Sequence, residues 1–233
     1  MTRRTLLGIA SAAAFSVSMA QAAEPVRQIG IYVQPYYEAA REPGGTSRVA
    51  VGRSFDGLAS NSREDIVAIR DSIIRDPKRL TPMTMMVLAI RLYDVGLRDD
   101  SVFWFYAAKD RYLTLAEVVD VATGGLAQVE QAVRDFATLA GPFINGYAFC
   151  DVANQQAIRA KALDWVEKNP YEAMFMEPLP AKSSNRRQAL VKAHALIRDN
   201  AAKERAYLQD PANVAKLRAD RAANGADDKY CWK

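Results

Sequence analysis

Apolar residues recur at helical spacing along most of the chain after about residue 60. Ile66, Ile69 and Ile73, for example, lie three and four positions apart and therefore share one face of a predicted helix. Capping residues, glycines and prolines interrupt the pattern at intervals and divide it into separate helices. The sequence predicts a mainly α fold, with about seven helices in one helical domain over residues 23–233.

Two helix boundaries depend on single signals. Thr114 is followed by Glu117 at the spacing of a capping box, which predicts that a new helix starts there after one over 99–112. Gly141-Pro142 predicts the end of a helix over 126–140, because a proline removes a backbone hydrogen bond inside a helix.

A period of two replaces the helical period near the start of the mature chain. Ile29, Ile31 and Val33 alternate with other residues, and so do Val49 and Val51. A Pro-Gly-Gly turn signal lies between the two runs. We expect a short β-hairpin, or two edge strands, within about residues 29–51.

The first 22 residues have the pattern of a cleavable export signal. Arg3 and Arg4 give a positive start, an apolar run follows, and Ala20-Gln21-Ala22 ends it with the small residues that a signal peptidase reads. We expect residues 1–22 to be removed and the mature protein to be periplasmic or secreted; an uncleaved amphiphilic helix is the alternative. Because Arg3-Arg4 matches the twin-arginine pattern only in part, the general secretory (Sec) route is favoured over the twin-arginine (Tat) route.

Charge and hydropathy narrow the range of partners. The chain has 31 basic and 27 acidic side chains, and removal of Arg3 and Arg4 leaves 29 basic ones. So small a net charge gives no support for nucleic-acid binding. After the signal, no segment approaches the roughly 20 apolar residues of a membrane-spanning helix, so we expect no stable membrane span.

Two cysteines remain in the mature chain, Cys150 and Cys231. In an oxidising compartment an even number of cysteines favours a disulfide, which here would hold a tail that ends two residues later. The chain-entropy model assigns ~4.5 kcal/mol to closing a loop of this length. Two free thiols are one alternative. A redox pair is another, although the Cys-x-x-Cys spacing typical of such pairs is absent.

Residues 85–108 carry small and large side chains at the positions of a helical hairpin. The matching positions are a small residue in the first helix, a turn glycine, a small residue at the helix crossing, a large buried residue and a second small one: Ala89, Gly96, Ser101, Phe105 and Ala108. The stretch resembles a single tetratricopeptide-type or Sel1-type hairpin. The resemblance implies two closely packed antiparallel helices and a surface for peptides. It covers one unit without a second copy, whereas a solenoid needs about three.

Four consecutive aromatic residues occupy positions 103–106 and therefore point around a whole helical turn. Either this helix is buried on all sides, or one aromatic face lines a groove. Tyr36 and Tyr37 form a second aromatic pair in a predicted loop. We take Tyr36, Tyr37, Trp104 and Tyr106 as candidate binding residues, because binding surfaces are rich in Tyr and Trp.

The residue patterns of common enzymes and cofactor sites are not found in the sequence. His194 is the only histidine and lies in a long predicted helix, which gives no support for a zinc site or a Ser-His-Asp triad. Phosphate-binding glycine loops and dinucleotide fingerprints are also missing. We expect no cofactor, no metal and no catalytic residue. Glu38, Glu42 and Asp56 still leave a carboxylate pair of the glycosidase type open.

Together these features favour a non-enzymatic exported protein that binds another protein or a peptide through a helical surface, for example as an immunity or inhibitor protein. A protein that binds a small molecule or a cell-wall fragment is the alternative, and a carboxylate-dependent hydrolase is the third reading. A deep apolar pocket with converging polar groups would favour the second reading. Two buried acids facing each other across a cleft would favour the third.

The export signal predicts where the mature protein starts. N-terminal sequencing of the exported chain should begin at Ala23, or within one or two residues of it, because Ala20 and Ala22 occupy the positions that direct cleavage. Recovery of chains with an intact Met1 from the periplasmic fraction would contradict this prediction.

Overall fold

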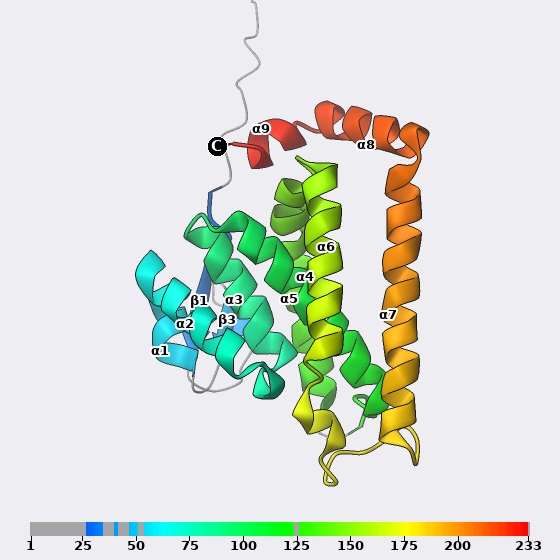
Figure 1. Ribbon diagram of the computed structural model, residues 1–233. Helices are drawn as coiled ribbons and strands as arrows, with labels where there is room; N and C mark the ends of the chain where they lie inside the picture. The colour runs from blue at the N-terminus through cyan, green and yellow to red at the C-terminus, as the bar shows by residue number, and fades with distance from the viewer. Residues whose placement is uncertain (1–26, 35–39, 42–46, 51–53, 124–125, 233) are drawn as a thin grey trace, which may run out of the picture.

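Helices make up most of the part of the chain that the computed structural model describes, which comprises residues 27–34, 40–41, 47–50, 54–123 and 126–232 (Figure 1). The mainly helical fold predicted from the sequence is therefore confirmed. The α-helices of this part are α1 (Phe55–Ala59), α2 (Arg63–Arg75), α3 (Pro82–Asp94), α4 (Arg98–Val118), α5 (Leu126–Ala148), α6 (Val152–Lys168), α7 (Arg186–Gln209), α8 (Pro211–Ala223) and α9 (Ala226–Tyr230). Two short 3-10 helices are η2 (Pro77–Arg79) and η3 (Glu172–Phe175).

Side chains cap the start of several of these helices. The Ser62 hydroxyl accepts a hydrogen bond from the Asp65 amide at the start of α2, and Thr81 does the same for Thr84 in α3. Asp151 caps α6 by accepting from the Asn154 amide. Each cap satisfies an amide that has no partner within its helix.

The predicted β-hairpin is not supported. Strand β1 (Ile31–Gln34) pairs with β3 (Ser47–Ala50) in parallel, and β2 (Ala40–Arg41) pairs antiparallel with β3. Parallel strands cannot be joined by a tight turn. The period-two pattern holds no information on the relative direction of the strands.

Two predicted helix boundaries are also wrong. Helix α4 continues through Thr114, whose buried hydroxyl donates to the Arg111 carbonyl at 2.9 Å instead of capping a new helix. Helix α5 continues to Ala148 with Pro142 inside it.

The core forms around α3 and α4. Every residue from Pro82 to Tyr93 in α3 is buried, as are the small residues Ser101 and Ala108 of α4. Gly96, with a φ of 81°, makes the turn between the two helices in a conformation that favours glycine. The expected helical hairpin over residues 85–108 is therefore present as α3 and α4.

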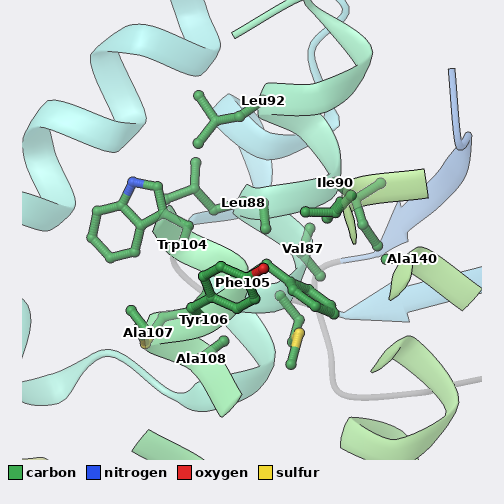
Figure 2. Packing of buried hydrophobic residues seen from close by; sticks show 14 of the residues in the cluster. Val87, Leu88, Ile90, Leu92, Trp104, Phe105, Tyr106, Ala107, Ala108 and Ala140 are labelled. Carbon is green, nitrogen blue, oxygen red and sulfur yellow. The ribbon is translucent and has the colours of Figure 1, made fainter. Parts of the chain in front are cut away.

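The aromatic run of α4 belongs mainly to this core. Figure 2 shows Trp104, Phe105 and Tyr106 in one packed cluster with apolar residues of α3 such as Leu88. Trp104 is 1% exposed, and its ring meets that of Trp165 edge-on at a centroid distance of 5.1 Å. Trp104 thus lies in the core and not on a groove.

The C-terminal tail is attached to the ends of α4 and α5. Cys150 and Cys231 lie at disulfide distance, with their sulfur atoms 2.00 Å and their Cα atoms 5.6 Å apart, as the cysteine count predicts. Arg98 stacks on the Trp232 ring at 3.9 Å and donates to the Trp232 carbonyl at 2.8 Å. A side chain at Gly146 would come within 2.5 Å of the Tyr230 ring, so α9 can pack this closely only against a glycine.

Arg111 is a buried arginine that bonds three backbone carbonyls and is fully shielded from solvent. Its Nη1 donates to the carbonyls of Pro77 and Leu80 at 2.6 and 2.8 Å, and its Nη2 donates to that of Asn169 at 2.5 Å. The guanidinium also lies over the Trp165 ring at 4.8 Å. Burial lowers the pKa of Arg111 to about 10, so the side chain stays charged at neutral pH.

Within the described residues, no helix combines the length and the apolar character that crossing a membrane requires.

Replacement of Arg111 by methionine should destabilise the protein by about 3 kcal/mol, because the carbonyls of Leu80 and Asn169 would lose their donor in the interior and that of Pro77 would keep only the Leu80 amide. Urea unfolding followed by circular dichroism measures the change. Lys161→Met on the exposed side of α6 is the matched control and should change stability by less than about 0.5 kcal/mol. Equal unfolding midpoints for the two variants would contradict the structural role of Arg111.

Candidate functional site

Helices α7 and α8 form an arm that runs beside α6 and then turns across its end (Figure 1). Where α7 faces α4 and α6, six polar side chains from four helices come together. This polar cluster consists of Tyr106 and Asp110 of α4, Asn145 of α5, Gln155 and Arg159 of α6, and Glu204 of α7.

Arg159 is the centre of the polar cluster. Its Nη1 and Nη2 donate to the two carboxylate oxygens of Asp110 at 2.5 and 3.0 Å. Its Nε donates to Glu204 at 3.4 Å. One guanidinium therefore holds a carboxylate of α4 and a carboxylate of the arm at the same time.

Gln155 joins the other members. Its amide nitrogen donates to Glu204 at 2.7 Å and to the Tyr106 hydroxyl at 3.1 Å, and that hydroxyl in turn donates to Asn145 at 3.3 Å. The Gln155 side-chain oxygen is buried and has no hydrogen-bond partner among the described residues. Several buried polar groups thus lie between α7 and helices α4 to α6, at positions where apolar residues could have packed.

Burial dominates the electrostatics of the cluster. It raises the pKa of Tyr106 to about 12, so the hydroxyl stays protonated and can donate to Asn145. Burial also raises the pKa of Asp110, although the ion pair with Arg159 acts in the opposite direction. The charge on Asp110 therefore depends on Arg159.

Two hollows lie between the arm and helices α4 to α6. The smaller has a volume of about 300 Å³ and is lined by most of the polar cluster together with Lys109, Leu113, Phe149 and Asn200. The larger, of about 690 Å³, lies against the start of α6, the end of α7, α8 and Cys150. Phe149 lines both hollows. We refer to the two together as the arm cleft.

The structure separates the candidate binding residues. Trp104 belongs to the core, whereas Tyr106 is buried but lines the smaller hollow of the arm cleft. Tyr36 and Tyr37 lie outside the described residues. Tyr106 alone of these four is placed at the arm cleft.

A search for aromatic residues does not find the other members of the polar cluster. The sequence of α7 contains a different signal for one of them. Helix α7 turns a stripe of small and apolar residues inward, from Ala189 through Ile197 to Ala201 and Leu208. Glu204 interrupts that stripe with a carboxylate. Polar residues at inward positions of a helix often mark functional contacts.

The polar cluster also tests the hypothesis of a carboxylate-dependent hydrolase, because it contains two carboxylates, Asp110 and Glu204, that Arg159 connects. A glycosidase pair needs one acid that donates a proton and another that is free to attack or to activate water. Here the same guanidinium binds both carboxylates. Neither of these two carboxylates is therefore free to attack or to activate water.

Replacement of Arg159 by methionine should destabilise the protein by about 3 kcal/mol at neutral pH, because Asp110 would remain as an unpaired buried carboxylate. Without Arg159 the folded-state pKa of Asp110 rises further above its unfolded value, so between the two values the folded protein binds more protons than the unfolded chain. Stability then falls as pH rises through this window. The loss relative to the wild type should therefore be largest at neutral pH and smaller in acid.

Urea unfolding at about pH 5 and at about pH 7 tests this expectation. The double variant Asp110→Asn/Arg159→Met removes the carboxylate, so its loss should change less with pH than that of the single variant. An equal loss for Arg159→Met at both pH values would show that Asp110 is not the group left unpaired.

Sequence comparison relates the chain to a protein of Haemophilus influenzae that is described as an uncharacterized protein. The two are 32% identical over 231 residues, which cover 97% of this chain and 88% of the relative. No protein-family model and no solved structure matches the chain. An identity at this level over nearly the whole length shows common descent, so the chain belongs to the same family as this Haemophilus influenzae protein.

Proposed function

We propose that the protein is exported to the periplasm and acts there by binding a segment of another polypeptide in the arm cleft. The observation that carries the proposal is the polar cluster in the wall of this cleft. Buried charges cost stability, and some natural proteins retain them because they confer specificity or take part in a functional site. An immunity or inhibitor protein is one form that this function can take.

The shape of the cleft supports a polypeptide ligand. Its two hollows share Phe149 and extend along α7 and α8, and both are lined by charged as well as apolar side chains. A peptide segment brings backbone donors and acceptors together with apolar side chains, so it can use both kinds of lining.

Two features support export. The first 22 residues have the three-part pattern of a secretory signal. The cysteine pair at disulfide distance suits an oxidising compartment.

A small molecule or a cell-wall fragment is the second candidate ligand. The smaller hollow, at about 300 Å³, is near the lower end of the usual range for small-molecule sites and has several polar groups that converge on it. Mass analysis of a cross-linked product separates this candidate from a polypeptide partner.

Site-specific photo-crosslinking tests the proposal. A photoreactive amino acid at Asn200, which is exposed and lines the smaller hollow, should cross-link in periplasm to a distinct polypeptide. Ala202 is the matched control, because it is exposed on the same helix and does not line either hollow.

A polypeptide product at position 200 and not at 202 is the expected result. The same products from both positions, or no polypeptide from position 200, would contradict binding in the arm cleft.

A further inference from the structure

We infer that the arm cleft takes an acidic segment of its partner polypeptide, and that Lys109 and Arg218 bind the carboxylates of that segment. The inference rests on the proposed function and gives the chemistry of the partner. It draws on the distribution of charge along the chain, on the ion pairs of the cleft and on the shape of the cleft.

Positive charge is concentrated on the arm. Residues 186–223 contain 9 of the 31 basic side chains of the chain but only 4 of its 27 acidic ones, which gives the arm a net charge of +5. The remaining residues hold 22 basic and 23 acidic side chains, a net charge of −1. The modest charge of the whole chain therefore conceals one basic element.

The acids that line the cleft already have partners within the protein. Asp110 and Glu204 are bound by Arg159, and Asp227 is bound by Arg221 at 2.7 Å. Asp151 accepts the amide hydrogen bond that caps α6. These carboxylates are thus held by groups of the fold.

Two cations of the cleft have no such partner. Lys109 lines the smaller hollow and Arg218 lines the larger one, and both side chains are exposed. Neither forms an ion pair with any acidic residue of the described chain. Lys109 approaches the Phe105 ring at 5.5 Å and interacts electrostatically with the neighbouring Asp110 without forming an ion pair with it. Each hollow therefore offers a ligand one cation outside any ion pair, in a lining that holds two basic and two acidic side chains.

The shape of the site favours a polypeptide over other polyanions. A lipid surface is flat and cannot enter a hollow between an arm and a helical layer, so the cations in the cleft would not reach its headgroups. A nucleic acid calls for a continuous basic surface. On the arm, Lys203 and Lys216 are instead paired with Asp199 and Asp220. A carboxylate-bearing chain that lies in the cleft meets both unpaired cations.

Reversal of these two charges tests the inference on the purified mature protein. A fluorescently labelled oligoglutamate peptide, blocked at both ends, should bind the wild type saturably in anisotropy measurements, and an oligoglutamine peptide of equal length should bind far more weakly. Lys109→Glu/Arg218→Glu should weaken oligoglutamate binding by about tenfold or more, because like charges would then face each other. Lys78→Glu places the same charge on the exposed η2 and should leave binding within about twofold.

The neutral variant Lys109→Gln/Arg218→Gln should lie between the wild type and the reversed variant, and circular dichroism verifies that all variants are folded. Equal binding of the two peptides, or an equal effect of Lys78→Glu, would overturn the inference. Binding to vesicles with anionic phosphatidylglycerol that the double reversal abolishes, without binding of oligoglutamate, would overturn it in favour of a lipid surface.

Photo-crosslinking at Asn200 is independent of these measurements. A partner that cross-links equally to the wild type and to the double-reversal variant would leave the proposed function intact. It would contradict the inference that the bound segment is acidic.

Discussion

The guanidinium of Arg111 connects three stretches of chain that the helices alone would leave separate. It bonds carbonyls at both ends of the short η2 segment and at the end of α6, while its flat face lies over Trp165. The carbonyls of Leu80 and Asn169 lie at segment ends, where a partner from outside the helix is needed, whereas that of Pro77 also accepts from the Leu80 amide at 3.4 Å. Because Arg111 belongs to α4, the central helix sets the positions of α3 and α6 around it.

The polar cluster begins at the residue before Arg111. Asp110 and Arg111 are both buried, but they meet different neighbours: Arg111 bonds backbone oxygen atoms, and Asp110 bonds Arg159 and, through it, the arm. The stripe by which α7 packs is made largely of alanine, so its apolar contact area is small. Compared with a helix that packs through large apolar side chains, α7 therefore depends more on the directional hydrogen bonds to Glu204. Such bonds fix the position of the arm and leave a cleft beside it.

Features that depend on contacts between neighbouring residues could be predicted from the sequence, whereas those that depend on contacts between distant segments could not. Ser62, Thr81 and Asp151 each bond an amide three residues away, so their caps can be recognised locally. Thr114 has the same local pattern, but its hydroxyl bonds a carbonyl within a helix that tertiary packing continues. The parallel pairing of β1 and β3, like the arm cleft, depends on contacts between distant segments. Asp110 and Arg159 are 49 residues apart, and a single sequence does not show that they meet.

The disulfide lies at the edge of the arm cleft. Cys150 lines the larger hollow, and Arg221 of α8 donates to the sulfur atoms of Cys150 and Cys231 at 3.4 and 3.1 Å. Arg221 also binds Asp227 of α9, so α8 and α9 are held to the start of α6 through one buried guanidinium and the cysteine pair. A reduced chain would keep the polar cluster but would lose the covalent link that holds α8 over the larger hollow. This covalent link requires an oxidising environment, which is the environment that the proposed export would provide.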